Sequence, residues 1–228
     1  MSGAAASLDA VETLVPFLRA RRDAPEPGDL RAADLIEDPD LLATVVRDTC
    51  EQRGSYDLQV LASLWWQGYS YRVAGGTLAA WVVAGSAPDP AAASGVGVGV
   101  SRGRPSSLVI GPDAVDITDL ETLIDQLFTG HLDLLAASLR ARHTIGERLL
   151  WGNTAASVAS CLGAIAGAEG APAGLGERIE RATIALPHDI AALGTWTTPH
   201  TDYRRATCCL WWKTTVSEGA LCEDCSLR

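Results

Sequence analysis

Four of the six cysteines are crowded near the C-terminus of the chain. Cys208 and Cys209 are adjacent, and Cys222 and Cys225 follow twelve residues later as a Cys-Glu-Asp-Cys pair. Thiolates bind zinc and iron–sulfur clusters, and a Cys-x-x-Cys pair can chelate either. In a reducing compartment, metal binding explains such crowding better than disulfides do. The spacing therefore predicts a four-thiolate metal centre.

Zinc and an iron–sulfur cluster are the two alternatives for this centre. Structural zinc sites use chelating pairs with two to four residues between the sulfurs, whereas Cys208 and Cys209 are directly adjacent and diverge in an extended chain. A two-iron cluster accommodates such a pair more readily. The spacing favours iron–sulfur over zinc and does not exclude zinc.

The residues around the cysteines are expected to shape the centre. Leu210, Trp211 and Trp212 follow the first pair and are expected to shield a cluster from water, which affects its reduction potential. Glu218-Gly219 offers a turn that returns the chain toward Cys222. The nearby charges nearly cancel: Arg204, Arg205 and Lys213 near the first pair, Glu223 and Asp224 between the last two cysteines.

The same segments resemble the FhuF-like ferric siderophore reductases, whose C-terminal [2Fe–2S] segment has an arginine-preceded Cys-Cys followed by Cys-x-x-Cys. The matching stretches are residues 204–212, Arg-Arg-Ala-Thr-Cys-Cys-Leu-Trp-Trp, and residues 221–227, Leu-Cys-Glu-Asp-Cys-Ser-Leu. Leu150-Trp151-Gly152-Asn153 resembles a tryptophan-glycine-asparagine signature in the helical part of that family. The gap between the cysteine pairs is slightly longer than in the family pattern, and Ser226 stands where proline is common.

This resemblance implies a [2Fe–2S] cluster held by Cys208, Cys209, Cys222 and Cys225. It implies an electron-transfer enzyme of iron transport that reduces a ferric siderophore, of hydroxamate type, and releases Fe(II). An upstream donor such as a ferredoxin or a flavin reductase would recharge the cluster. Hard oxygen donors prefer Fe(III), so reduction weakens the complex. Two other functions remain open: an iron–sulfur redox sensor, and a zinc-stabilised helical binding module without catalysis.

Composition limits the remaining classes of function. The chain has 228 residues, 47% hydrophobic and 20% charged, which is typical of a folded protein. Its net charge of −10 and its lack of a Lys/Arg-rich run argue against nucleic-acid binding. The first residues carry Asp9 and Glu12 and no basic region, so no secretory signal is expected. We expect a cytoplasmic protein and leave membrane association open.

The elements that position the cysteines are expected to be mainly helical. Apolar spacing predicts helices at residues 8–19, 38–54, 56–84, 119–139 and 145–168. The least polar stretch, residues 149–168, is expected to be a buried helix, and no integral membrane segment is expected. Alternating valines at 96–100 predict a β-hairpin with residues 108–110.

The fold class expected from these elements is mainly α: a helical main body with a small β-hairpin, plus a small C-terminal cysteine-rich iron–sulfur segment. The expected division is a helical FhuF-like domain at residues 1–187 and a [2Fe–2S]-binding segment at residues 188–228.

Other chemically notable residues are expected to be structural. Cys50 and Cys161 fall in predicted helices and should behave as small apolar side chains. The histidines show no ligand spacing and are expected at the surface or at helix ends: His131, His143, His188 and His200. Of these, His200 is the candidate for a hydrogen bond near the centre. The tryptophans before the tail are expected in the core rather than as redox relays: Trp65, Trp66, Trp81 and Trp151.

Overall fold

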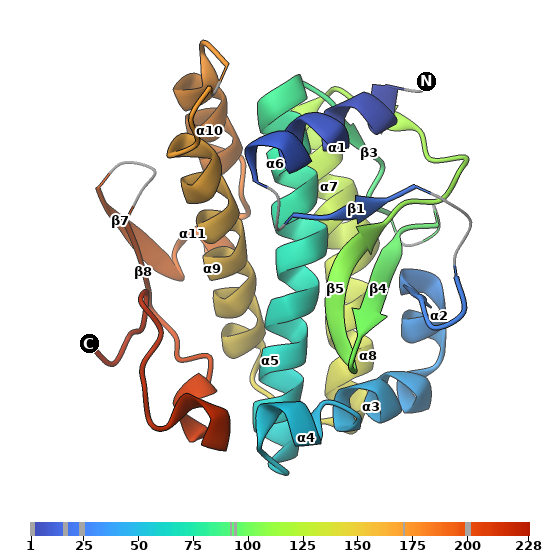
Figure 1. The fold of residues 1–228 in the computed structure, drawn as a ribbon, viewed down its shortest axis with the longest axis vertical. Helices are drawn as coiled ribbons and strands as arrows, with labels where there is room; N and C mark the ends of the chain where they lie inside the picture. Colours follow the sequence, from blue (N-terminus) through green and yellow to red (C-terminus); the bar gives the residue numbers. More distant parts are fainter. Residues whose placement is uncertain are drawn as a thin grey trace.

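One continuous helical rod runs through the middle of the molecule (Figure 1). It consists of helix α5 (Leu58–Ser70), the π-helical turn η1 (Tyr71–Gly75) and helix α6 (Gly76–Ala84). The Asp57 carboxylate caps its start by accepting two backbone N–H groups of the first turn. Most of its side chains are buried, so this rod is the axis of the hydrophobic core.

The computed structural model describes residues 3–15, 18–22, 26–91, 93, 95–170, 172–198 and 202–228. Before the rod come α1 (Gly3–Leu14), β1 (Ala20–Arg21), β2 (Leu30–Arg31), α2 (Ala32–Glu37), α3 (Pro39–Arg47) and α4 (Cys50–Arg53). After it come β3 (Ala87–Pro88), β4 (Gly97–Ser101), β5 (Arg104–Val109), β6 (Asp116–Ile117), α7 (Leu120–Leu127), η3 (Phe128–Leu132) and α8 (Asp133–Arg142). The rest of the chain forms α9 (Glu147–Ala166), α10 (Leu175–Ile184), α11 (His188–Ala191), β7 (Gly194–Thr198), β8 (Asp202–Arg205), η4 (Trp211–Lys213) and η5 (Thr215–Ser217).

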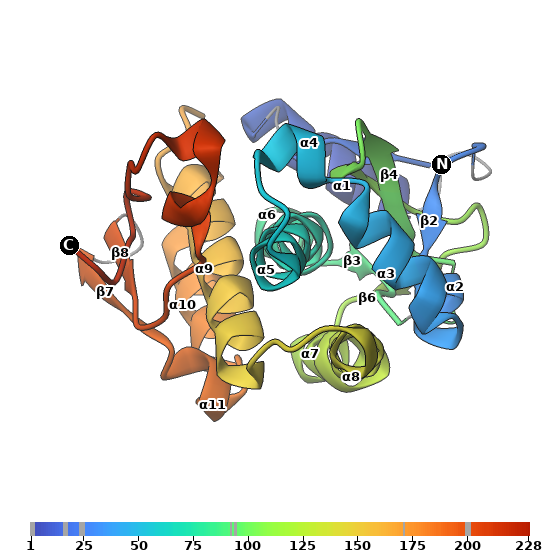
Figure 2. The same cartoon turned by 90° about the horizontal axis from the view of Figure 1, so that it is seen from below.

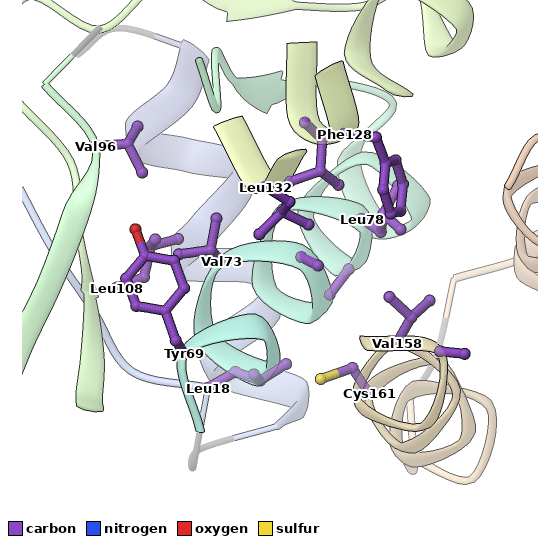
Figure 3. Packing of buried hydrophobic residues seen from close by; sticks show 14 of the residues in the cluster. Leu18, Tyr69, Val73, Leu78, Val96, Leu108, Phe128, Leu132, Val158 and Cys161 are labelled. Carbon is purple, nitrogen blue, oxygen red and sulfur yellow. The ribbon is translucent and has the colours of Figure 1, made fainter. Parts of the chain in front are cut away.

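The other elements surround this rod on several sides. Seen from below, α9 lies on one side of α5 and the strands with α3 on the other, while α7 and α8 close a third side (Figure 2). Side chains from these layers meet at the rod (Figure 3): Tyr69, Val73 and Leu78 from the rod, Phe128 and Leu132 from η3, and Val158 and Cys161 from α9. The mainly α fold expected from the sequence is confirmed.

The predicted β-hairpin is present and is larger than expected. Strands β4 and β5 pair antiparallel, with Val98 opposite Leu108. Two short strands extend the pair into a four-stranded sheet of order β1-β5-β4-β2, with β1 parallel to β5. Strands of two residues carry too short an alternation to be recognised in a sequence.

Helix α9 is the buried helix that its composition predicted. Within the described residues it is the one helix long and apolar enough to cross a membrane, and 72% of its most apolar window is buried inside the fold. Its small residues permit close packing: a Cβ on Gly75 of η1 would lie 2.3 Å from the Cys161 sulfur. The helix therefore packs directly against the central rod.

The expectation that the histidines lie at the surface or at helix ends is wrong for His131, which is buried within η3, and is confirmed for His143, which is buried but caps the end of α8. In π-helical turn η3, His131 Nδ1 bonds to the carbonyl of Pro90. That contact makes Nδ1 the donor, so Nε2 accepts from the Tyr69 hydroxyl at 2.7 Å. A single sequence did not reveal this pair, because its members are 62 positions apart. His200 lies outside the described residues.

We expect His131 to make the stability of the protein fall in mild acid. Burial lowers the pKa of His131 to about 4, whereas an unfolded histidine titrates near 6.5. Between these values the unfolded chain binds the extra proton, so this contribution is present above pH 6.5 and is lost as the pH falls toward 4. Urea unfolding should show a loss of about 2 kcal/mol between pH 7 and pH 5 from this group.

The control for this prediction is a comparison of pH slopes. His131→Gln should be less stable at pH 7 and should lack this part of the pH dependence, whereas Tyr69→Phe keeps the imidazole and should retain most of it. An unchanged pH slope in His131→Gln would show that other groups cause the acid sensitivity.

Candidate metal centre

A short β-hairpin delivers the first cysteine pair. Strand β8 pairs antiparallel with β7 and ends at Arg205, three residues before Cys208. The loop that follows passes very close to α9: a Cβ on Gly152 would lie 1.8 Å from the Thr207 Oγ1. Glycine at this position therefore lets the cysteine loop lie against the helix, which gives a physical reason for the glycine in Leu150-Trp151-Gly152-Asn153.

The return toward the second pair is built from two short helical turns. Leu210 has a left-handed backbone, with φ 68, and starts η4, which contacts α5; η5 follows and contacts α4. The Thr215 N–H donates to the Gly54 carbonyl at 3.0 Å and fixes this loop to the end of α4. Glu218 and Gly219 both have positive φ, so the turn expected there is confirmed. In Figure 1 this segment is red and lies beside α4.

The two loops bring one cysteine of each pair into contact. The sulfurs of Cys209 and Cys222 are 3.1 Å apart, beyond the disulfide bond length of about 2.05 Å, and all six cysteines are free. Cys208 and Cys225 lie in the same loops, but the four cysteines do not form one ligand group in this structure. Among the described residues, no three His, Cys, Asp or Glu side chains surround a single metal position.

Backbone donors point at the sulfurs. The N–H groups of Leu210 and Leu227 donate to the sulfurs of Cys208 and Cys225, both at 3.4 Å. The backbone of Trp211 bonds to Cys209 in the same way. Metal-bound thiolates accept such bonds, which stabilise their negative charge.

The surroundings favour a thiolate at Cys209. The hydrogen bond from Cys222 lowers the pKa of Cys209 against the opposing effect of burial, and the Arg205 guanidinium lowers it further. The same contact raises the pKa of Cys222, because the two sulfurs share one proton. Metal binding requires deprotonated thiols, so a thiolate held ready at neutral pH assists it.

An apolar cluster covers the inner side of the cysteines. Val60 and Leu64 of α5 pack against Cys209, with Trp211 and Cys222 at the edge of the same cluster. The shielding role expected for Trp211 fits this position. The same expectation is wrong for Trp212, which is 41% exposed and lies beside Lys213 instead.

A hydrogen-bond network ties both cysteine loops to the helical body. The buried Arg205 binds the Asp224 carboxylate from Nε at 2.8 Å and from Nη2 at 2.7 Å, and donates from Nη1 to the Asn153 Oδ1 at 3.1 Å. The Asn153 amide donates to the Ser63 hydroxyl at 2.9 Å, and that hydroxyl donates to the Cys209 carbonyl at 2.8 Å. Arg205 therefore links the Cys222–Cys225 loop to α9, and Ser63 links α5 to the first cysteine pair.

Sequence reasoning missed most of this network. Arg205 entered the prediction as a local charge and as part of the matching stretch 204–212, and Asn153 as part of the second resemblance. Ser63 carried no signal at all, since a serine in an apolar helix is common. The arginine three residues before Cys208 and the asparagine after Gly152 were the available clues, but these two residues lie 52 positions apart.

Cys50 and Cys161 lie apart from the centre. Cys161 is buried in α9 near the Tyr71 carbonyl, and burial raises its pKa to about 12. Cys50 is half-buried at the start of α4. The apolar role expected for Cys161 is confirmed. The tryptophans expected in the core are buried as well: Trp65, Trp66, Trp81 and Trp151.

The donor set fits an iron–sulfur cluster. Four free thiols in two loops, backbone N–H groups directed at three sulfurs, and an apolar cover are features of an all-thiolate cluster site. A pocket of about 670 Å³ is lined mainly by residues of α7, η3 and α10 and by no cysteine, so it does not belong to this centre.

Comparison with known proteins assigns the chain to a family. The family model described as ferric iron reductase FhuF-like transporter matches residues 63–189, more than half of the chain. The match begins at Ser63 and includes Asn153, and it ends before the first of the four C-terminal cysteines. A search of curated proteins found no match. The chain belongs to the FhuF-like ferric iron reductase family.

Proposed function

We propose that this protein is a [2Fe–2S] electron-transfer enzyme that reduces a ferric siderophore and releases the iron as Fe(II). The observation that carries the proposal is the pair of cysteine loops, anchored through Arg205 and Ser63 to helices of a ferric reductase family, with backbone donors directed at the sulfurs. Cys208, Cys209, Cys222 and Cys225 would hold the cluster, which supplies one-electron chemistry.

The chain's own groups have defined tasks in this function. The N–H groups of Leu210, Trp211 and Leu227 stabilise negative charge on the sulfurs. Val60 and Leu64 exclude water from the inner side of the site. Electron transfer to Fe(III) needs no proton-transfer residue, so the protein has only to hold donor and chelate close together. Reduction then weakens the hold of hard oxygen ligands on the iron.

The remaining parts of the proposal concern organisation and partners. Residues 188–228 would act as the cluster-binding segment and residues 1–187 as the helical domain that supports it. The enzyme would work in the cytoplasm, with a ferredoxin or a flavin reductase as electron donor. Its substrate would be a siderophore that binds Fe(III) through hard oxygen atoms, and hydroxamates are one such class.

The function predicts a measurable electron balance. Chemically reduced, cluster-loaded protein under strict anaerobiosis should be reoxidised by a ferric hydroxamate or catecholate siderophore at least about tenfold faster than in buffer. About one Fe(II) should be trapped by a ferrous chelator per electron delivered. The chelator pulls the transfer forward by removing the product. Absorption of the cluster and of the Fe(II) complex reports both halves of the reaction.

The alternatives give different results in the same experiment. Reduced protein that reoxidises no faster with any of several ferric siderophores than in buffer would sink the reductase and favour a redox sensor. A colourless protein with one zinc per chain and no labile sulfide would indicate the zinc-stabilised binding module.

A further inference from the structure

A second pocket, of about 360 Å³, lies beside the cysteine centre. Its walls come from α4, α5, η1, β5 and the C-terminal segment, and Cys222 forms part of its lining together with Trp211. A molecule in this pocket would therefore lie next to one of the proposed cluster ligands. The position suits a substrate that receives an electron through Cys222.

Among the described residues, three arginines and no acidic side chain line this pocket. Arg53 comes from α4, Arg72 from η1 and Arg104 from the start of β5. Such a concentration of positive charge is unusual in a chain whose net charge is −10. Exposed Arg104 has no ion-pair or side-chain hydrogen-bond partner among the described residues.

The positions of these arginines are energetically unfavourable in the absence of an anion. Arg53 lies 6.0 Å from the centroid of the Trp211 ring, and its buried Nε has no hydrogen-bond partner within the described part of the chain. Burial and, to a smaller extent, the nearby Arg104 lower the pKa of Arg53 to about 10, so the guanidinium stays charged at neutral pH. Arg72 lies 5.1 Å from the centroid of the Tyr71 ring. A bound anion would offset the repulsion among these cations and supply the missing acceptor.

We propose that this pocket binds the ferric chelate through Arg53, Arg72 and Arg104, and that it selects chelates of net negative charge, such as those with catecholate or free carboxylate groups. The proposal rests on the proposed function and narrows its substrate class. A neutral tris-hydroxamate chelate lacks the charge that these side chains recognise. Trp211 and Tyr71 offer flat faces for planar ligand groups.

The neighbouring cavity does not serve such a substrate. A pocket of about 480 Å³ shares Gln67 and Tyr71 with the pocket at Cys222. It is lined by Asp202, Glu223 and Asp224, and by no cysteine. Its single arginine, Arg205, is already paired with Asp224. An anion is therefore favoured in the pocket at Cys222 and disfavoured in the neighbouring one.

A small chelate fits the pocket at Cys222 better than an acidic protein partner does. A protein surface could reach exposed Arg104, but the unpartnered Nε of Arg53 is buried. A compact anion can enter the pocket and approach both. Multiply charged chelates also gain from arginine because its planar fork binds pairs of oxygen atoms.

The test measures binding of redox-inert chelates to the cluster-loaded full-length protein. Gallium(III) forms complexes of the same charge as iron(III) and accepts no electron. Calorimetric titration should show the anionic gallium tris-catecholate binding at least about tenfold more tightly than a neutral gallium tris-hydroxamate. Arg104→Gln should weaken the anionic complex about tenfold, equivalent to ~1.4 kcal/mol, and leave the neutral one unchanged. Added salt should weaken the anionic complex.

Arg102 provides the matched control, because it is an exposed arginine in the turn between β4 and β5 and does not line the pocket. Arg102→Gln removes the same charge and should change both affinities less than about twofold. Arg53→Gln should weaken the anionic complex as Arg104→Gln does, with cluster absorption as the check on folding. Arg104 is exposed, so its variant remains informative if Arg53→Gln fails to fold.

Three results would overturn the proposal. One is equal affinity for the neutral and the anionic gallium chelates. Another is an equal effect of Arg104→Gln and Arg102→Gln. The third is unchanged gallium binding in Arg104→Gln combined with slower cluster reduction by an acidic plant-type ferredoxin, which would assign the arginines to the electron donor. Arginine-dependent binding without reduction of the matching ferric chelate would instead sink the reductase function and leave this binding site standing.

Discussion

Single replacement of Cys208, Cys209, Cys222 or Cys225 by serine should abolish or severely deplete the cluster. The wild-type protein, purified without oxygen, should be red-brown and contain about two irons and two acid-labile sulfides per chain. Each serine variant should lose most of the iron, the sulfide and the visible absorption, because a hydroxyl is a poor replacement for a thiolate on iron. Iron and sulfide analysis with an absorption spectrum measures the effect.

The chain supplies matched controls in its two other cysteines. Cys161 is buried against η1 and Cys50 is half-buried at α4, both outside the cysteine loops. Cys50→Ser and Cys161→Ser should keep the full iron and sulfide content, although Cys161→Ser should lower stability by about 1 to 3 kcal/mol because it buries a hydroxyl. Loss of colour in a control that remains folded would refute the ligand assignment.

Among substitutions of buried residues in the C-terminal segment, replacement of Arg205 by leucine should produce the largest loss of stability. The side chain of Arg205 is 2% exposed and that of Asp224 is 26% exposed, so removal of the guanidinium leaves a partly buried carboxylate and the Asn153 oxygen without their donor. We expect a loss of about 3 kcal/mol, the lower end for a broken buried pair because Asp224 retains some water. The urea midpoint should fall by about 1 to 2 M.

A variant of the neighbouring Arg204 is the control that distinguishes loss of this network from simple loss of charge. Arg204 is exposed, and within the described part of the chain its side chain donates only to the carbonyls of Cys225 and Arg228, at 3.4 and 3.2 Å. Arg204→Leu removes the same charge and should shift the midpoint by less than a third as much. Arg205→Lys should be intermediate, since a single ammonium cannot reproduce the fork that meets both Asp224 and Asn153. Equal shifts for Arg204→Leu and Arg205→Leu would argue against the network.

Cluster retention is a second property to measure in the same variants. Arg205 connects the Cys222–Cys225 loop to α9, so Arg205→Leu should release the cluster at a lower urea concentration than the one that unfolds the helical body. Absorbance and tryptophan fluorescence followed in one titration report the two events. If both signals change together in this variant and in the wild type, the C-terminal segment unfolds with the body.

The amino-acid pattern was sufficient for features that depend on neighbours in the chain. The helical character of the rod followed from apolar spacing in residues 56–84, the β4–β5 hairpin from alternating valines, and α9 from its small apolar residues. The prediction that the four cysteines form one ligand set used residue type, crowding and spacing, which are all local features of the chain. Helical and strand periodicities are set by backbone geometry, which acts over a few residues.

Tertiary structure decided the features that depend on distant segments meeting. Ser63, Asn153 and Arg205 come from three separate elements and carry no spacing signal, yet they anchor both cysteine loops. The buried Tyr69–His131 pair and the pocket arginines Arg53 and Arg104 likewise become neighbours only when the chain folds. The order of residue types fixes which side chains can bond. Burial and packing of α4, α5, α9 and the C-terminal loops fix which of them do, because a buried polar group must find its partner wherever the fold places one.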